Sequence, residues 1–285
     1  MSKNHKVPGT GLAIVFLLLA LAPDVRAVDS EQPDKSTALN CTTAREYITT
    51  LEYLRTKSDI KLLDQDAQKI AGQVAEGCTG AAQRFIRVTS MLLQAGITWP
   101  DAAKQGLSFA SRSETAAETF ITVFRRAFLA RDLDLDMQSA LQMATSLSSE
   151  FAKEFGEDLK SARKDFDLLV GYCTRADRLS LPKPQCGAFA ARITKLGRFW
   201  EKGVARDFIS TFDYLRSDKG PALITGDALQ IAEELVKNGP GSIDNFMVGY
   251  RYGVSAKGLN MDSRAAVNFA RKMAQRKLPP ETKTD

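Results

Sequence analysis

The sequence predicts an all-α fold, a right-handed α-solenoid of about six helical hairpins. The main observation is an aromatic residue followed by an alanine, 24 positions later in five places and 25 positions later in a sixth. Between the two, apolar residues recur at helical spacing, and no segment is predicted to form a strand. The pairs are Tyr47/Ala71, Phe85/Ala110, Phe120/Ala144, Phe166/Ala190, Phe208/Ala232 and Phe246/Ala270. Units of this size cannot bury their apolar faces alone, so we expect them to stack.

The aromatic residue of each pair is expected on the first helix of a hairpin. In the third unit, Phe120, Val123, Phe124 and Ala127 follow the spacing of one helix face. The charge-rich segment 150–165 also carries apolar residues at helical spacing, and we expect it to extend the first helix of the fourth unit. The spacing is nearly constant within units and variable between them, which indicates that the hairpin is the structural unit.

The alanine of each pair is expected on the second helix, where that helix approaches its neighbour closely. A motif of alternating apolar residues ending in aspartate precedes it, as in Leu133-Asp-Leu135-Asp136. Asp101, Asp136 and Asp262 each lie 16 residues after their aromatic residue. We predict that these three carboxylates are N-caps of second helices, because aspartate accepts hydrogen bonds from the free amides of a first turn.

The N-terminal segment has the pattern of a secretory signal peptide. Lys3 and Lys6 precede an apolar run over 12–22, and Val25-Arg26-Ala27 supplies the small residues for cleavage before Val28. The run is shorter than the roughly 20 residues of a membrane-spanning helix, so no membrane span is expected after cleavage. We therefore expect export to the periplasm or the extracellular space. The expected organisation is a signal peptide over 1–27, a flexible mature N-terminus over 28–40, the α-solenoid over 41–274 and a disordered tail over 275–285.

The composition excludes several classes of enzyme. The only histidine, His5, lies in the expected signal peptide, so the mature chain has no imidazole. Ser-His-Asp and Cys-His catalysis are therefore excluded, as are zinc sites that need histidine ligands. The mature chain keeps 36 Lys and Arg against 33 Asp and Glu, and a net charge near +3 does not indicate a nucleic-acid partner. We expect no catalytic residue, no metal ion and no cofactor.

The four cysteines of an exported chain are expected to pair, and three connectivities are possible. Cys41 precedes the first helix of unit one and Cys78 follows its second helix, so a bond between them would close the open end of that hairpin. Cys173 and Cys186 flank the turn of unit four and would bond across it. We predict these two disulfides, with free buried thiols as the alternative.

The last unit reads Gly249-Tyr-Arg-Tyr252-Gly-Val-Ser-Ala-Lys-Gly258-Leu-Asn-Met-Asp262-Ser-Arg-Ala-Ala-Val-Asn-Phe-Ala270. It resembles a Sel1-type tetratricopeptide-like repeat, a family that places Gly, Tyr, a Gly-rich turn, Asp and paired alanines in this order. The turn is slightly longer here, and the other five units match by periodicity while lacking most of the glycines. The resemblance implies a superhelical binding scaffold and contributes no catalytic residue.

A stripe of residues stands six positions after each repeat aromatic. Its members are Tyr53, Met91, Arg126, Tyr172, Tyr214 and Tyr252, which include four of the six tyrosines in the chain. Position +6 lies at the flank of the core face of a helix, where a tyrosine ring can pack while its hydroxyl stays in water. The stripe is therefore interpreted as packing between units. The alternative is a ligand-facing ladder that would bind a partner through Tyr172, Tyr214, Tyr252 and Arg126.

These features favour a non-enzymatic, exported scaffold that binds a protein or peptide partner along a superhelical groove. Two alternatives remain at this point. One is a histidine-independent hydrolase that uses paired carboxylates on a cell-envelope polymer. The other is a structural or chaperone-like envelope protein. The sequence leaves the partner and the oligomeric state open.

Overall fold

The protein is all-helical throughout the part of the chain that the structure, a computed structural model, describes: residues 43–57, 60, 62–179, 181–200 and 203–275. The predicted all-α class is thus confirmed for these residues. None of the helices in these ranges is both long and apolar enough to cross a membrane. The expected signal peptide and the segment 28–40 lie outside the described residues. Gln275, placed in the tail by sequence, is the last residue of the last helix.

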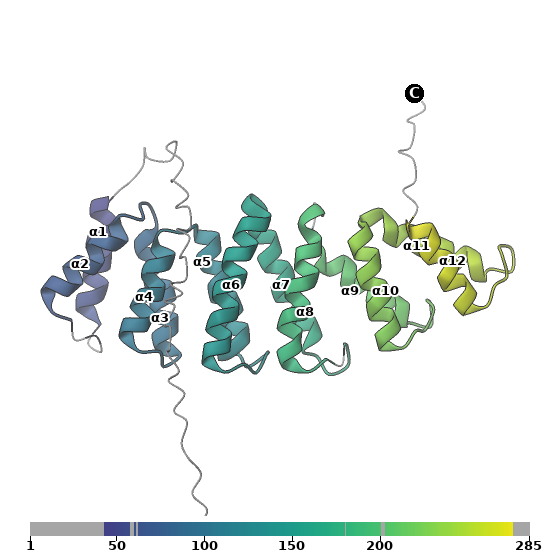
Figure 1. Ribbon diagram of the computed structural model, residues 1–285, viewed down its shortest axis with the longest axis horizontal. Coiled ribbons are helices and arrows are strands. Elements are labelled where there is room, and N and C mark those ends of the chain that lie inside the picture. The colour runs from purple at the N-terminus through teal and green to yellow at the C-terminus, as the bar shows by residue number, and fades with distance from the viewer. Residues whose placement is uncertain (1–42, 58–59, 61, 180, 201–202, 276–285) are drawn as a thin grey trace, which may run out of the picture. The chain divides into compact units, whose positions relative to one another are not determined.

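The helices follow one another with short connections (Figure 1). Their bounds are α1 Thr43–Thr56, α2 Asp64–Ala75, α3 Ala81–Gln94, α4 Trp99–Ala110, α5 Glu114–Phe124, α6 Met137–Phe155, α7 Leu159–Cys173, α8 Lys183–Leu196, α9 Ala205–Arg216, α10 Thr225–Asn238, α11 Pro240–Val254 and α12 Ser263–Gln275. A π-helical segment, Arg125–Leu129, continues α5.

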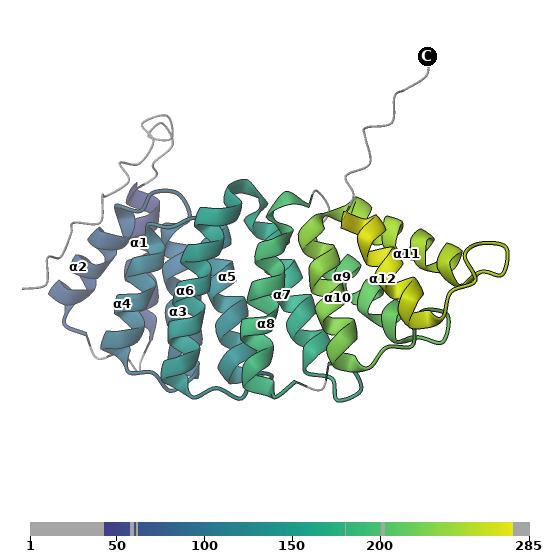
Figure 2. The ribbon, with the colours of Figure 1, turned by 45° about the vertical axis from the view of Figure 1, so that its right-hand side comes forward.

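Each odd-numbered helix packs against the even-numbered helix that follows it. Successive odd-numbered helices from α1 to α9 also contact one another, and α6, α8, α10 and α12 form a second series of contacts. Figure 2 shows α6, α8 and α10 side by side, with α5, α7 and α9 in the layer behind them. The odd-numbered helices therefore share one surface.

Small residues on the even-numbered helices allow this close packing. The repeat alanine and the residue four positions before it are buried in all six units: Ala67/Ala71, Gly106/Ala110, Ala140/Ala144, Cys186/Ala190, Ala228/Ala232 and Ala266/Ala270. A Cβ atom at Gly106 would lie 2.1 Å from Thr89 Oγ1, and one at Gly253 would lie 2.9 Å from Ala266 Cβ. The repeat aromatics are also buried, apart from the half-buried Tyr47. The period of the sequence therefore marks the contacts between paired helices.

Two of the three predicted aspartate caps are confirmed. The Asp136 carboxylate accepts from the N–H of Ser139 at 2.9 Å, which holds the pKa of Asp136 below its ordinary value. Asp262 accepts from the N–H of Ala265 at 2.8 Å. The prediction for Asp101 is wrong: Thr98 occupies the cap position, and its hydroxyl donates to the Asp101 carboxylate at 2.8 Å. Pro100 favours this earlier start, because a proline in the first turn gives up no intrahelical hydrogen bond.

The expected extension of the fourth unit's first helix is confirmed over 159–165, which belong to α7, and is wrong over 150–158. The first part of that segment belongs to α6, which ends at Phe155. Gly156 takes a positive φ of 50°, a conformation that glycine adopts readily, and α7 begins at Leu159. Helical periodicity continues on both sides of the break, so the glycine, not the apolar pattern, decides where the helix ends.

The fourth hairpin carries a disulfide. Cys173, at the end of α7, and Cys186, in α8, have sulfur atoms 2.08 Å apart and Cα atoms 5.6 Å apart. This is the pairing expected across the turn of unit four. Cys41 lies outside the described residues, so the Cys41–Cys78 bond stays a prediction.

Candidate binding groove

Three hollows lie between successive odd-numbered helices. They have volumes of about 550 Å³ between α3 and α5, about 410 Å³ between α5 and α7, and about 790 Å³ between α7 and α9. The first two share Ile121, Arg125 and Ala130 in their lining. The second and third share Arg126, Lys164 and Asp167. Because neighbouring hollows have walls in common, we treat them as one groove that crosses α3, α5, α7 and α9.

Positive charge is concentrated in this groove. Its lining holds eight cationic side chains and three carboxylates, an excess of five positive charges. The cations are Arg87, Arg125, Arg126, Arg163, Lys164, Arg175, Arg178 and Arg206, and the carboxylates are Asp165, Asp167 and Asp213. The groove excess equals the formal net charge of the whole chain, +5.

Each of the three carboxylates already has donors from the protein. Asp167 accepts from Arg126 Nε at 2.7 Å, and Arg126 Nη1 also donates to Asp132 at 2.7 Å. These two bonds raise the pKa of the Arg126 guanidinium. Asp213 accepts from the Tyr172 hydroxyl at 2.6 Å and from Arg178 at 3.2 Å.

The Asp165 carboxylate accepts hydrogen bonds from the backbone. It accepts from the N–H groups of Val204 at 2.8 Å and Ala205 at 3.3 Å, so a carboxylate from α7 caps the start of α9. Burial raises the pKa of Asp165 despite these two donors. With Asp167 and Asp213 also engaged, all three groove carboxylates accept hydrogen bonds from the protein. Among the described residues, no cluster of three or more Cys, Asp or Glu is placed to hold a metal ion.

Three cations of the groove have no carboxylate partner within the described ranges: Arg125, Lys164 and Arg206. All three side chains are exposed. Arg125 begins the π-helical segment after α5, Lys164 lies on α7 and Arg206 lies on α9. Arg125 and Lys164 line the hollow between α5 and α7, and Lys164 and Arg206 line the hollow between α7 and α9. The groove therefore presents three exposed cations that form no ion pair among the described residues.

The π-helical segment shapes the middle of the groove. The N–H of Ala130 donates to the carbonyl of Arg125 at 2.8 Å, five residues back, and this wider turn presents Arg125 and Leu129 to the hollow between α3 and α5. Single π-turns within helices are common at functional sites. Sequence periodicity could not reveal this segment, because the apolar spacing from Phe120 to Ala127 fits an α-helix.

The residues of the tyrosine stripe mostly contact the next unit. The Tyr53 hydroxyl lies 2.8 Å from Ser90 Oγ, Tyr172 donates to Asp213, and the Tyr214 ring packs edge-on against Tyr250 with centroids 6.5 Å apart. Tyr252 is 52% exposed. Of the four candidate partner-binding residues, Arg126 and Tyr172 line the groove, whereas Tyr214 and Tyr252 are absent from the lining of its three hollows.

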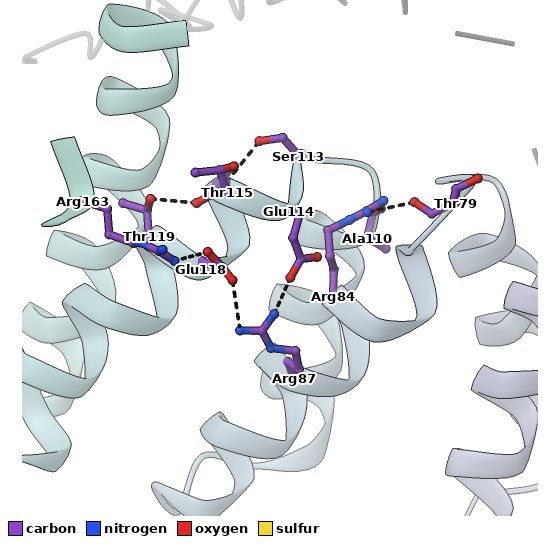
Figure 3. A network of polar contacts seen from close by, with 11 residues as sticks. Thr79, Arg84, Arg87, Ala110, Ser113, Glu114, Thr115, Glu118, Thr119 and Arg163 are labelled. Atoms are coloured by element: carbon purple, nitrogen blue, oxygen red, sulfur yellow. Dashed lines mark hydrogen bonds and ion pairs between the residues drawn. The ribbon is translucent and has the colours of Figure 1, made fainter. Parts of the chain in front are cut away.

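Ion pairs join the odd-numbered helices beside the groove. Arg87 of α3 pairs with Glu114 and, at 3.8 Å, with Glu118 of α5, and Glu118 pairs with Arg163 of α7 (Figure 3). Glu118 thus links three successive first helices. This network therefore spans both walls of the hollow between α3 and α5 and reaches α7.

Two buried charges that sequence reasoning missed fix the first two hairpins. The Glu46 carboxylate accepts from the N–H groups of Gly80 at 3.1 Å and Ala82 at 2.7 Å, so α1 caps α3. Arg84 donates to the carbonyls of Gly77, Thr79 and Ala110 at 2.6–3.1 Å, partly visible in Figure 3. Burial lowers the pKa of Arg84.

No family model, curated protein or solved structure matches this chain. The resemblance of the last unit to Sel1-type repeats stays a prediction, and inference about function depends on the groove itself.

Proposed function

We propose that the protein is an exported α-solenoid scaffold that binds a protein or peptide partner along the groove across α3, α5, α7 and α9. The observation that carries this proposal is the row of hollows with shared walls. Repeat arrays bind extended partners on a surface that successive repeats share, because stacking repeats generates one continuous concave face. The groove is lined by both apolar and charged side chains, as protein-binding surfaces are.

The groove is held in place before any partner arrives. Glu118 links α3, α5 and α7 through ion pairs, and Asp165 of α7 caps α9. A preorganised surface loses little conformational entropy on binding. Export is proposed from the signal-peptide pattern over 1–27, and the disulfide between Cys173 and Cys186 suits an oxidising compartment such as the periplasm or the extracellular space.

Site-specific photo-crosslinking in the native compartment tests the proposal. A photoreactive residue replaces Leu168, which lines the groove and is 42% exposed, and in a second protein it replaces Lys104, an exposed residue of α4. We expect a protein adduct from position 168 and none from position 104.

A groove-filling variant makes this test specific. A Cβ atom at Gly171 would meet only Arg126 Nη2, at 3.9 Å, so the side chain of Gly171→Leu starts from open space in the groove lining. Gly72→Leu is the matched control, because a Cβ atom there meets nothing within 4 Å and Gly72 lies on α2, outside the groove. The adduct at position 168 should disappear with Gly171→Leu and persist with Gly72→Leu. Equal adducts from positions 168 and 104, or an adduct insensitive to Gly171→Leu, would refute the groove as the binding site.

A further inference from the structure

We propose that the segment bound in the groove is an acidic peptide with apolar residues between its carboxylates. This inference depends on the proposed function and adds the chemistry of the partner. Its basis is Arg125, Lys164 and Arg206, the three exposed groove cations that pair with no carboxylate in the described part of the chain. Arginine and lysine bind carboxylates through charge-assisted hydrogen bonds.

The groove carboxylates form their hydrogen bonds with other partners, and Asp165 acts electrostatically on Arg206 without forming an ion pair with it. Asp165 is held by the backbone of α9, Asp167 by Arg126, and Asp213 by Tyr172 and Arg178. Lys164 lines both of the last two hollows, with Arg125 in one and Arg206 in the other. An incoming anionic group would form new ion pairs with these cations. A cationic segment would be repelled by them, so the groove would discriminate by charge.

The arrangement of the cations predicts the spacing of the acidic residues. Lys164 and Arg206 each lie two residues before their repeat aromatic, Phe166 and Phe208, so they stand at the same level on neighbouring first helices. Packed helices have axes about 8–10 Å apart, and an extended peptide advances about 3.3 Å per residue. These two cations therefore match carboxylates about three residues apart. Arg125 lies further along its helix and matches a carboxylate about four or five residues away.

Apolar side chains of the groove favour a peptide over other polyanions. Leu129 and Leu168 are 39% and 42% exposed, and Ile121 and Ile209 are half-buried in the same lining. These residues can contact apolar side chains placed between the acidic ones. Single-stranded nucleic acids are bound by stacking on exposed aromatic rings. The one aromatic residue in the lining of the three hollows is Tyr172, which is buried and bonded to Asp213.

The test uses the whole mature chain and three fluorescein-labelled synthetic peptides. The first is a peptide of about twelve residues with glutamate at every third position and leucines between, following the spacing derived above. In the second, lysine replaces each glutamate, and in the third, serine replaces each leucine. Fluorescence anisotropy gives the affinity of each. We expect the Glu/Leu peptide to bind best, and to bind more weakly when salt is raised from about 0.05 to about 0.3 M.

Two charge-reversed proteins locate the interaction. One combines Arg125→Glu, Lys164→Glu and Arg206→Glu in the groove. The other combines Lys104→Glu, Lys153→Glu and Lys237→Glu on the exposed surfaces of α4, α6 and α10, with the same change in net charge. We expect the first to lose about tenfold or more in affinity for the Glu/Leu peptide and the second to change by less than about twofold. Thermal melts followed by circular dichroism should show that both remain helical.

The possible outcomes separate this inference from the proposed function. Equal losses of affinity in the two charge-reversed proteins would show that binding responds only to net charge. Tighter binding of the lysine peptide than of the Glu/Leu peptide would show that the groove prefers cations. Either result overturns the inference. Tighter binding of the Glu/Ser peptide, or of heparin, would indicate a general polyanion site and also overturns it. If the acidic peptide fails to bind while the position 168 adduct forms and is lost with Gly171→Leu, the inference of an acidic partner is refuted and the proposed function stands. If the adduct is also missing, both proposals are refuted.

Discussion

Gly106→Ala is the most direct test of the close packing between α3 and α4. The added Cβ atom would lie 2.1 Å from Thr89 Oγ1 and 2.9 Å from Phe85 Cδ2, and both neighbours are fully buried. Neither can move into solvent, so we place the overpacking penalty at about 2–3 kcal/mol. The higher helix propensity of alanine offsets about 1 kcal/mol of this. The free energy of unfolding should therefore fall by about 1–2 kcal/mol.

Gly72→Ala is the matched control, because it makes the same chemical change in the neighbouring hairpin. No atom lies within 4 Å of its added Cβ atom, and Gly72 lies inside α2. We expect it to raise the free energy of unfolding by about 0.5–1 kcal/mol. Urea denaturation followed by the helical circular dichroism signal measures both variants. Opposite shifts of the midpoint support the close contact between α3 and α4, whereas stabilisation by Gly106→Ala would refute it.

Three further predictions concern packing and ionisation. Ala232→Leu should lower the free energy of unfolding by about 1–3 kcal/mol, because Ala232 is fully buried; an unchanged melting temperature would contradict this. Tyr214→Ala should destabilise the protein by about 3 kcal/mol, by analogy with other aromatic truncations. It should leave peptide affinity per folded molecule unchanged, since Tyr214 does not line the three hollows. Loss of affinity without loss of stability would instead support the ligand-facing tyrosine ladder. Burial raises the pKa of Asp165, so the folded state binds more protons than the unfolded state between the ordinary and the raised pKa. The free energy of unfolding should therefore decrease as pH rises through that window, and Asp165→Asn should remove this component of the pH dependence measured by denaturation.

The sequence predicted the packing positions well because close contact limits residue size in the same way in every unit. The alanines at 144, 232 and 270 are all fully buried, and the phenylalanines that precede them by 24 residues are too. A position of this kind tolerates few residue types, so the same residue type recurs there in successive units. The helix ends were less predictable, since Pro100 and Gly156 act locally and do not follow the 24-residue spacing of the repeat.

The groove could not be predicted from the repeat, because its charges occupy positions that packing leaves free. The position two residues before the repeat aromatic holds Gln83, Glu118, Lys164, Arg206 and Asp244 in successive units. Only the side-by-side placement of α5, α7 and α9 brings Lys164 and Arg206 into one hollow with Arg125 beside them. Residues that vary between units are therefore the ones that give this face its charge.

The exposure of the tyrosine stripe depends on whether another first helix follows. Tyr172 and Tyr252 occupy the same position of their units, yet Tyr172 is 6% exposed and Tyr252 is 52% exposed. Tyr172 lies against α9, whereas no described helix packs beyond α11 in that direction. The same residue type at the same position is buried where a neighbour is present and exposed where none is described, so contact between units accounts for the stripe. The tyrosines of the stripe therefore pack between first helices, and the proposed partner would be selected by the charges beside them, Lys164 and Arg206.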